Sequence, residues 1–251
     1  MPKTIDFDQV ADIYDIYVTT QLDVAFFLKE AQQAAGAILE LMSGTGRVSL
    51  PLLEQGFALT CLDYSEKMLA VLEGKLKAKG LTAKLHHLDV CEMALEQQFE
   101  LIFIPFHAFS EIITPKRQIE ALRRIYAHLS PEGRFICTLH NPTVRLKSVD
   151  GSLRFRGQFS YDHHQLVLTC TEQYDPQTCC VHGLQFFEHY DAQHDLLAKK
   201  MLAIKFFVHD YDSFRNLVTA IGFQVVTVYG DYNDAVYEAK SSPFMIWVLQ
   251  K

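Results

Sequence analysis

An apolar run that leads into two closely spaced glycines constrains the fold of this chain more than any other feature. Ala37 to Leu41 have the composition of a buried strand, and Val48 to Glu54 open a helical pattern. Gly44 and Gly46 therefore lie at a turn from a strand into a helix. Backbone N–H groups at such a helix start can face a ligand, and glycine lets a ligand approach the main chain closely.

A second apolar run, Ala58 to Leu62, places Asp63 at the end of the next expected strand. A carboxylate at that point can accept hydrogen bonds from both hydroxyl groups of a ribose. Gly46 precedes Asp63 by 17 residues, close to the roughly 20 that a strand–helix–strand unit requires. The two runs together predict a nucleoside-binding site.

Glu40 favours one class of nucleoside over another. A dinucleotide-binding turn has a third glycine, but Arg47, Val48 and Ser49 follow the pair here. An acidic side chain would repel a pyrophosphate, whereas it would attract the ammonium group of an amino acid. The site therefore favours a nucleoside with a cationic tail, which fits S-adenosylmethionine, over the NAD of a dinucleotide-dependent oxidoreductase.

The turn resembles the first motif of class I S-adenosylmethionine-dependent methyltransferases, which is commonly E/D-x-G-x-G-x-G. Met42 stands in the place of the first glycine. The resemblance implies that Glu40, Gly44 and Gly46 line the methionine end of the cofactor. It also implies that Asp63 holds the ribose.

The same resemblance assigns the adenine side of the cofactor. Tyr64 and Met68 are expected to pack beside the adenine. Asp89 is expected to accept a hydrogen bond from the adenine amino group, with the N–H of Val90 near a ring nitrogen. As an alternative, Asp89 is a turn residue that follows a strand.

Helical and strand patterns alternate through most of the chain. Helices are expected at residues 21–34, 48–54, 65–80, 114–129 and 210–220, a turn at 130–133, and strands at 37–41, 58–62, 85–88, 100–105, 134–139, 223–229 and 244–249. This order predicts an α/β fold with a Rossmann-like sheet of the class I methyltransferase kind. The sheet is expected to be mostly parallel with an antiparallel last strand, and to have helices on both faces.

From Gly151 to about Val208 the pattern changes. Four β-compatible runs, at residues 153–159, 166–174, 181–190 and 197–208, follow one another without a helix. We expect an antiparallel sheet inserted after the fifth strand, which serves as a lid over the substrate. Residues 1–150 would then form the cofactor-binding core with an N-terminal lid helix, and residues 209–251 would complete the core sheet.

Taken over nearly its whole length, the chain is similar to small-molecule methyltransferases that act on amines, including glycine/sarcosine and amino-sugar N-methyltransferases. Tyr14-Asp15-Ile16-Tyr17 resembles their Y-D-x-x-Y opening, in which an N-terminal segment closes over the cofactor. This implies a cofactor contact for Tyr14 and a position on the substrate side for Tyr17. Alternatively, both are core tyrosines of a first amphipathic helix.

Acceptor-binding residues are expected in the loops at the carboxyl ends of the strands, where open α/β sheets bind ligands. Phe106, His107 and Glu111 follow the fourth strand, and His140 and Asn141 follow the fifth. We take Glu111, His107 and His140 as candidate catalytic residues, with Phe106 and Asn141 on the substrate side. Each could instead be an ordinary loop residue. Some amino-sugar N-methyltransferases have a histidine near the place of Glu111.

Composition narrows the possible partners and location. A net charge of −7 and a sequence pI near 5.9 argue against a general nucleic-acid-binding surface. Six cysteines show no regular framework, which indicates a reducing, cytoplasmic environment. The pair Cys179-Cys180 with His182 has no second metal-binding motif, so no metal is expected. The start of the chain shows no secretory signal pattern and no run of about 18 apolar residues occurs, so no membrane association is expected.

The sequence thus predicts an S-adenosylmethionine-dependent methyltransferase of a small molecule whose acceptor atom is an amine nitrogen. Its product would be S-adenosylhomocysteine, and a homodimer is possible. O- or C-methylation of a small metabolite is the alternative within the same fold. A dinucleotide-dependent oxidoreductase and a non-catalytic cofactor-binding protein are the alternatives from other classes.

Overall fold

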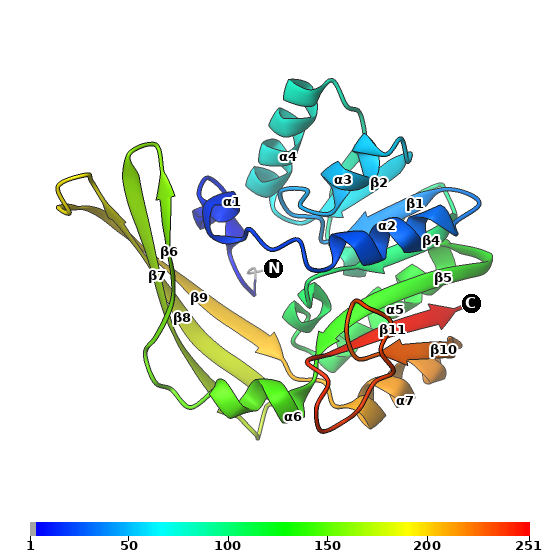
Figure 1. Cartoon of the computed structure of the whole chain (residues 1–251). Coiled ribbons are helices and arrows are strands. Elements are labelled where there is room, and N and C mark those ends of the chain that lie inside the picture. Colours follow the sequence, from blue (N-terminus) through cyan, green and yellow to red (C-terminus); the bar gives the residue numbers. More distant parts are fainter. Residues whose placement is uncertain (1–3) are drawn as a thin grey trace.

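Seven strands form the central sheet of the computed structural model, in the order β10-β11-β5-β4-β1-β2-β3 (Figure 1). The strands are β1 (Ile38–Leu41), β2 (Leu59–Asp63), β3 (Lys84–His87), β4 (Phe99–Ile104), β5 (Leu129–His140), β10 (Gln224–Tyr229) and β11 (Phe244–Gln250). The first five pair in parallel, whereas β11 is antiparallel to both β5 and β10. The expected mostly parallel sheet with an antiparallel last strand is confirmed.

The structure describes residues 4–251. Met1 to Lys3, the first part of the segment expected to lack a secretory signal, lie outside these residues.

Helices cover both faces of the sheet, as expected. One face carries α2 (Val24–Gln32), α3 (Ser49–Glu54) and α4 (Glu66–Lys79), and the other carries α5 (Pro115–His128) and α7 (Tyr211–Ile221). In α4, the buried side chains of Leu69, Leu72 and Leu76 recur at helical spacing and face the sheet. The hydroxyl oxygen of Ser65 accepts from the Met68 N–H at the start of α4, and Gly80 ends the helix at a φ of 64°.

β5 differs from the expectation at its start. Residues 130–133 were expected to form a turn before the strand, but β5 already begins at Leu129 and includes them. The expected turn survives as an irregularity: Glu132 has a φ of 65°, and the pairing with β4 shifts register between Phe99 and Leu101. Leu129 pairs with Phe99 of β4, and the N–H of Lys251 donates to the carbonyl oxygen of Gly133 at 3.1 Å, so contacts at both ends hold these residues at the sheet.

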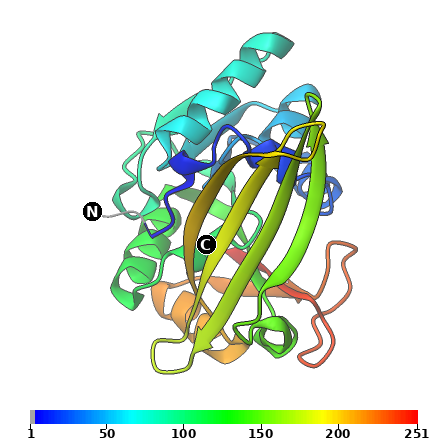
Figure 2. The same ribbon diagram turned by 90° about the vertical axis from the view of Figure 1, so that its left-hand side faces the viewer.

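A separate four-stranded antiparallel sheet lies between β5 and α7 in the chain. Its strands are β6 (Arg154–Tyr161), β7 (His164–Asp175), β8 (Cys180–Tyr190) and β9 (Leu196–Phe207). The sheet stands to one side of the core in Figure 1 and extends across its face in Figure 2. We call the side that faces the core the inner face; on β7 the buried Leu166, Leu168 and Cys170 alternate on it. The expected inserted antiparallel sheet is therefore confirmed.

The N-terminal segment lies between the inserted sheet and the core (Figure 1). It contains the single helical turns η1 (Phe7–Gln9) and α1 (Tyr14–Tyr17). One apolar cluster joins it to the inner face: Ile5, Val10, Ile13, Leu166, Leu168, Phe187, Leu202 and Ile204. On its other side, Asp15 accepts a hydrogen bond of 2.7 Å from the Thr45 hydroxyl and forms an ion pair with Lys75. The segment thus connects the inserted sheet to the glycine turn.

The remaining elements are short: η2 (Val90–Glu92), η3 (Ala108–Glu111), α6 (Pro142–Arg145) and η4 (Leu146–Ser148). All six cysteines are free thiols, and only Cys179 is partly exposed. Over residues 4–251, no helix is long and apolar enough to cross a membrane.

Phe187 tests the contact between the N-terminal segment and the inserted sheet. Its ring is fully buried and lies 4.9 Å from that of Tyr17. We expect Phe187→Ala to lower the free energy of unfolding by about 3–5 kcal/mol and to speed amide hydrogen exchange in residues 5–17. Phe186→Ala is the control, because Phe186 points to the opposite face, and it should cost about 1 kcal/mol or less. Equal effects of the two substitutions would contradict the docking described here.

Candidate active site

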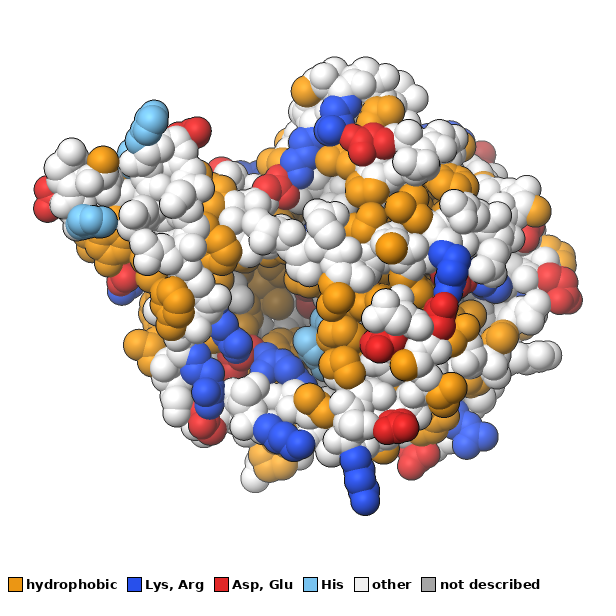
Figure 3. Space-filling model, in the orientation of Figure 1, with side chains coloured by type: hydrophobic (Ala, Val, Ile, Leu, Met, Phe, Trp, Pro, Cys, Tyr) orange, Lys and Arg blue, Asp and Glu red, His pale blue; other side chains and the backbone are white. Residues whose placement is uncertain are grey.

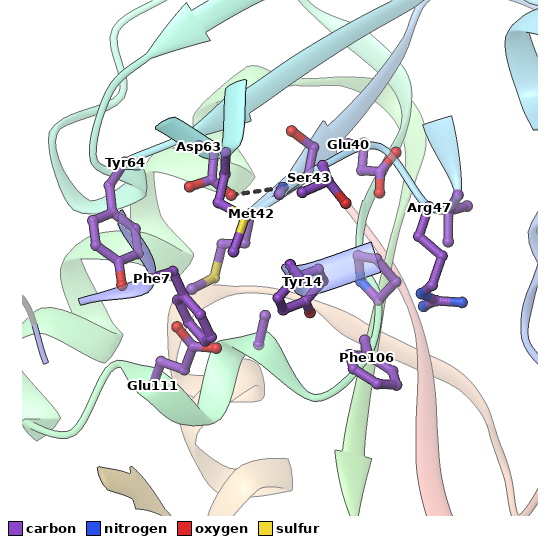
Figure 4. A pocket seen from close by; sticks show the side chains of 16 residues that line it. Phe7, Tyr14, Glu40, Met42, Ser43, Arg47, Asp63, Tyr64, Phe106 and Glu111 are labelled. Atoms are coloured by element: carbon purple, nitrogen blue, oxygen red, sulfur yellow. Dashed lines mark hydrogen bonds between the residues drawn. The ribbon is translucent and has the colours of Figure 1, made fainter. Parts of the chain in front are cut away.

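The candidate site lies at the carboxyl ends of β1, β2 and β4. In the sheet, β2 lies on one side of β1 and β4 on the other, so the strand order changes direction here. Open α/β sheets bind ligands at such a switch point. The cavity found there, the methionine-end cavity, is lined by Phe7, Tyr14, Glu40, Met42, Ser43, Gly44, Thr45, Arg47, Val48, Asp63, Tyr64, Met68, Pro105, Phe106, Ala108 and Glu111 (Figure 4).

The two glycines of the turn have different roles. Gly44 has a φ of 56°, and a Cβ atom added to it would meet no atom within 4 Å. Gly46 has a φ of 84°, but its added Cβ would lie 2.3 Å from a methyl carbon of Leu72, and Gly46 does not line the cavity. Gly44 therefore leaves open space for a ligand, whereas Gly46 allows the turn to pack against α4. The ligand contact expected for Gly46 stays a prediction, and packing against Leu72 is a second reason for glycine at this position.

Met42 occupies the first glycine position of the methyltransferase motif and keeps the backbone conformation of a glycine. Its φ is 56°, in the left-handed region that disfavours a residue with a Cβ. Its side chain lines the methionine-end cavity. The departure from the motif therefore changes what fills the cavity but not the path of the turn.

Asp63 and Glu40 place two carboxyl groups in the wall of the cavity. Asp63 accepts from the Gly44 N–H at 2.7 Å, the bond drawn in Figure 4, and from the Ser65 N–H at 2.8 Å. Glu40 is 1% exposed and accepts from the Ser49 hydroxyl at 2.5 Å. Burial raises the pKa of Glu40 to about 8 and that of Asp63 to about 6. A cationic ligand would stabilise the ionised form of both groups.

A second cavity adjoins the first, and we call it the adenine-end cavity. Met42, Tyr64 and Glu111 line both. The second cavity is further lined by Thr4, Leu62, His87, Leu88, Asp89, Val90, Cys91, Glu92, Ile112, Ile113, Thr114 and Arg117. Together the cavities bring the two sets of expected cofactor residues to one continuous region.

The residues expected beside the adenine lie in both cavities. Met68 is buried in the methionine-end cavity, and the Tyr64 hydroxyl donates to the carbonyl oxygen of Ile5. Asp89 accepts from the Cys91 N–H at 2.9 Å and forms an ion pair with Arg117. Asp89 therefore both caps a turn, the alternative considered from the sequence, and faces the cavity.

Tyr14 and Tyr17 lie on the same helical turn but in different surroundings. Tyr14 lines the methionine-end cavity and points into it in Figure 4. Tyr17 lies between Tyr14, at 5.4 Å between ring centroids, and Phe187 of the inserted sheet. The two tyrosines are three residues apart, one fewer than in the pattern that they resemble.

Glu111 lies among the residues that are expected to bind the cofactor. It lines both cavities, and Figure 4 shows it near Phe7 and across the cavity from Asp63. Burial raises its pKa to about 8, and the negative charge of Asp63 adds to the shift. The catalytic role on the acceptor expected for Glu111 stays a prediction, and its place in both cavities also puts it in the expected cofactor region. Glu111 is the last residue of η3, the single helical turn that follows β4.

His107 and His140 form a stacked pair at the ends of β4 and β5. Their ring centroids are 3.5 Å apart, and the buried Nδ1 of His107 finds no hydrogen-bond partner within residues 4–251. Burial and the neighbouring His140 and Arg145 hold the pKa of His107 well below its ordinary value. Burial and Arg145 lower the pKa of His140 to about 3. Both imidazoles are therefore neutral at physiological pH.

Asn141 has a structural role instead of the expected substrate contact. Its amide nitrogen donates to the carbonyl oxygens of Ala239, at 3.0 Å, and Ser242, at 2.7 Å. Its amide oxygen accepts from the Thr143 N–H at 3.1 Å. The side chain is completely buried, because it anchors the loop before β11 to the end of β5.

Sequence analysis missed Arg47 and Phe7 as cavity residues. Arg47 pairs with Asp23, its Nη2 lying 2.7 Å from Oδ2, and its guanidinium carbon lies 4.6 Å from the ring centroid of the exposed Phe106. Phe7 packs edge-on against Tyr14 at 6.0 Å. The position of Arg47 directly after the glycine pair was a usable signal, whereas nothing near Phe7 in the sequence indicated its role.

These residues fit S-adenosylmethionine. Glu111 and Tyr14 line the cavity and carry a carboxyl and a hydroxyl group. Glu40 supplies a buried carboxyl group where a cationic tail would lie, and Gly44 leaves the backbone open. No group of three or more His, Cys, Asp or Glu side chains within residues 4–251 is arranged to hold a metal ion.

Comparisons with known proteins agree with this geometry. Residues 38–133, which include the glycine turn and β1 to β4, match the family model described as a methyltransferase domain. The glycine/sarcosine N-methyltransferase of Halorhodospira halochloris is 26% identical over 256 residues, covering 97% of this chain and 86% of the relative. This chain is an S-adenosylmethionine-dependent methyltransferase.

Solved structures show the same fold. The CcbJ methyltransferase of Streptomyces caelestis superposes with a TM-score of 0.80 at 21% identity, covering 99% of this chain and 98% of that one. The sugar N-methyltransferase KedS8 of Streptoalloteichus sp ATCC 53650 superposes with a TM-score of 0.73 at 15% identity, covering 94% and 92%. The likeness extends over the inserted sheet as well as the methyltransferase core.

The raised pKa of Glu111 predicts how stability depends on pH. The folded, cofactor-free protein keeps the proton of Glu111 up to about pH 8, whereas an ordinary glutamate loses it near 4.5. Folded protein therefore binds more protons between these values, and Glu111 lowers stability as pH rises through this interval. We expect Glu111→Gln to stabilise the cofactor-free enzyme by about 1–3 kcal/mol at pH 8 and by little at pH 4. Urea unfolding at both pH values measures the difference.

Glu73→Gln, at an exposed position of α4, is the control for this measurement and should change stability little at either pH. A Glu111→Gln variant whose stability followed the pH dependence of the parent would show that Glu111 ionises normally in the fold.

The negative charge of Asp63 is expected to strengthen cofactor binding. Asp63→Asn keeps the size of the side chain and removes its charge, so it should weaken S-adenosylhomocysteine binding by about ten- to a hundredfold. Calorimetric titration measures the dissociation constant. Asp210→Asn is a matched control, because Asp210 accepts from the Ser213 N–H at the start of α7. A dissociation constant unchanged by Asp63→Asn would exclude this carboxylate from the binding site.

Proposed function

We propose that this enzyme transfers the methyl group of S-adenosylmethionine to the nitrogen of a small amine. The observation that carries the proposal is the pair of neutral imidazoles, His107 and His140, at the ends of two adjacent strands. The Nδ1 of His107 is buried and has no hydrogen-bond partner within residues 4–251. When the acceptor displaces the groups that cover it, this nitrogen accepts a hydrogen bond from the amine N–H and so orients the nitrogen lone pair.

Neutral, weakly basic imidazoles suit an amine better than a hydroxyl group. An amine in its free-base form already has the lone pair that attacks the methyl group, whereas an alcohol or phenol must first lose a proton to a base. The low pKa of His140 makes it a poor base for that purpose. Neutral rings also avoid repulsion with the positive charge of a sulfonium.

The names of the relatives support the same acceptor atom. The relative from Halorhodospira halochloris acts on glycine and sarcosine nitrogen, and KedS8 is named as a sugar N-methyltransferase. Both acceptors are small molecules that carry an amine. We extend to this chain the shared feature, a small amine, and neither named substrate.

In the proposed complex, the charges of the cavity match the parts of the cofactor. Glu40 pairs with the methionine ammonium group, Gly44 makes room for the main chain of that end, and Asp63 accepts from the ribose hydroxyls. Tyr14 closes over the cofactor, and Tyr64, Met68, Asp89 and Val90 surround the adenine. Glu111, protonated at neutral pH, donates a hydrogen bond near the ribose, between the two cavities.

The cofactor supplies a methyl group already activated by a positively charged sulfur. The protein then has to align the acceptor and exclude water more than supply a strong catalyst. Phe106 and Tyr17 form aromatic walls on the acceptor side, and His107 fixes the direction of the nitrogen lone pair. His140 stacks on His107 and holds its ring in place. The six free cysteines support a reducing compartment such as the cytoplasm.

Labelled cofactor tests the reaction directly. The enzyme is incubated with metabolite extracts and S-adenosylmethionine that carries a trideuterated methyl group, and products are found by mass spectrometry. We expect at least one small amine to gain the labelled methyl on nitrogen, and the Asp63→Asn variant to lose this product. Labelled methyl found only on oxygen or carbon would overturn the amine proposal in favour of O- or C-methylation.

His107 gives the mutational test. Its backbone has a φ of 64°, which asparagine tolerates better than most residues, so His107→Asn removes the imidazole with little strain. Turnover should fall by about a hundredfold, with S-adenosylhomocysteine affinity unchanged. His182→Asn, at an exposed position of β8, should retain full turnover. Full activity of His107→Asn would remove the imidazole from the reaction.

A further inference from the structure

Two arginines form ion pairs with one buried glutamate of the inserted sheet. Glu172 of β7 lies on the inner face with Leu166 and Leu168, because residues two apart on a strand point the same way. One of its carboxylate oxygens contacts Arg145 of α6, and the other contacts Arg156 of β6. The side chain of Glu172 is 6% exposed, and those of Arg145 and Arg156 are 16% and 38% exposed.

The sheet leaves room for this cluster. Gly183 of β8 pairs with Glu172 across the strands, and a Cβ added to Gly183 would lie 3.2 Å from the Cγ atom of Glu172. It would also lie 2.4 Å from the carbonyl oxygen of Thr171. Because Gly183 has no side chain, the side chain of Glu172 has room beside β8 and contacts both arginines.

The cluster borders the acceptor side of the active site. Arg145 ends the short helix that follows β5 and His140, and its positive charge contributes to the low pKa values of both His140 and His107. The guanidinium of Arg145 lies 5.5 Å from the ring centroid of Phe206 on the inserted sheet. Figure 3 shows a hollow between the inserted sheet and the core, with histidine and basic side chains along its border.

The cluster carries a surplus of one positive charge. Two arginines face one glutamate, and the two histidines beside them are neutral. Each guanidinium has five N–H donors, of which Arg145 uses some on Glu172 and Ser148 and Arg156 uses some on Glu172 and the Cys170 sulfur. A partly buried surplus charge with unused donors is stabilised by an anion that enters the hollow.

We propose that Arg145 and Arg156 bind an anionic group, a carboxylate or a phosphate, on the acceptor. The acceptor is then a small amine that also carries an acidic group, held with the acid at the arginines and the amine towards His107. This inference rests on the proposed amine methylation for the identity of the second group. The anion site itself follows from the cluster alone.

A purely structural role for the cluster makes a different prediction. Arg145 joins the core to the inserted sheet through Glu172, whereas Arg156 belongs to the inserted sheet itself. Arg156→Gln leaves the pair of Arg145 and Glu172 in place, and it removes the surplus charge together with the contacts of Arg156 to Glu172 and the Cys170 sulfur. A structural role predicts no change in anion binding for this variant, whereas an anion site predicts its loss.

Acetate and inorganic phosphate serve as the probes. Each is titrated into enzyme saturated with S-adenosylhomocysteine, at ionic strength held constant with sodium chloride, and the melting temperature is followed. We expect a saturable rise for one or both anions, which also distinguishes a carboxylate site from a phosphate site. Arg156→Gln should raise the apparent dissociation constant by about tenfold or more, as for the loss of a charge-assisted hydrogen bond.

Lys199→Gln is the matched control. It removes one positive charge from the outer face of the same sheet, where Lys199 pairs with Glu188, and should bind the anions as the parent does. The absence of saturable anion binding by the parent, or equal binding by Arg156→Gln, would overturn the proposal. So would an equal loss of binding in Lys199→Gln, because the effect would then be one of net charge.

Turnover separates this inference from the proposed function. Matched acceptors are compared at subsaturating concentration, glycine with glycinamide and glucosamine 6-phosphate with glucosamine. The parent should prefer the acidic member of at least one pair by about tenfold or more, and Arg156→Gln should lose that preference. Methylation of the neutral members alone would support the amine function and overturn the anion site. Saturable anion binding without methylation of any amine would support the anion site and overturn the amine function.

Discussion

Parallel pairing of β1 with β2 on one side and β4 on the other is the constraint on which the active site depends. It brings the ends of three strands to one edge, where the Gly44 N–H donates to the Asp63 carboxylate across the β1 and β2 termini. That hydrogen bond fixes the turn and the carboxylate relative to each other before any ligand binds. Glu40 of β1 lines the same cavity.

Burial disfavours the ionised forms of the carboxyl groups in the cavity wall, and a cationic ligand would favour them. Burial raises the pKa values of Glu40, Asp63 and Glu111, so their ionised forms are disfavoured in the protein without cofactor. A ligand with a sulfonium and an ammonium group restores the favourable interaction for the carboxylates it meets. In the proposed acceptor site the opposite arrangement holds, since neutral histidines and a surplus arginine favour an anion. The two halves of the site thus differ in the sign of the charge that they accept.

The inserted sheet and the N-terminal segment complete the site from outside the core. The apolar cluster around Phe187 holds the segment against the sheet, and Asp15 ties it to Thr45 in the glycine turn. Tyr14 reaches the cavity from this segment, while Arg156 and Glu172 pair with each other on the inserted sheet. The N-terminal segment therefore contacts both the inserted sheet and the glycine turn, and it belongs to neither.

The sequence by itself determined the α/β fold, the inserted sheet and the use of S-adenosylmethionine, because these depend on local patterns: alternation of apolar residues, a glycine turn and a carboxylate at a strand end. Tertiary structure decided what depends on long-range packing. Gly46 packs against Leu72 of α4. The amide nitrogen of Asn141 donates to two carbonyl oxygens about a hundred residues further along the chain. Glu111 and Arg145 show the same limit: a loop's direction and an arginine's neighbours on another sheet are set by the fold, and no spacing in the sequence encodes them.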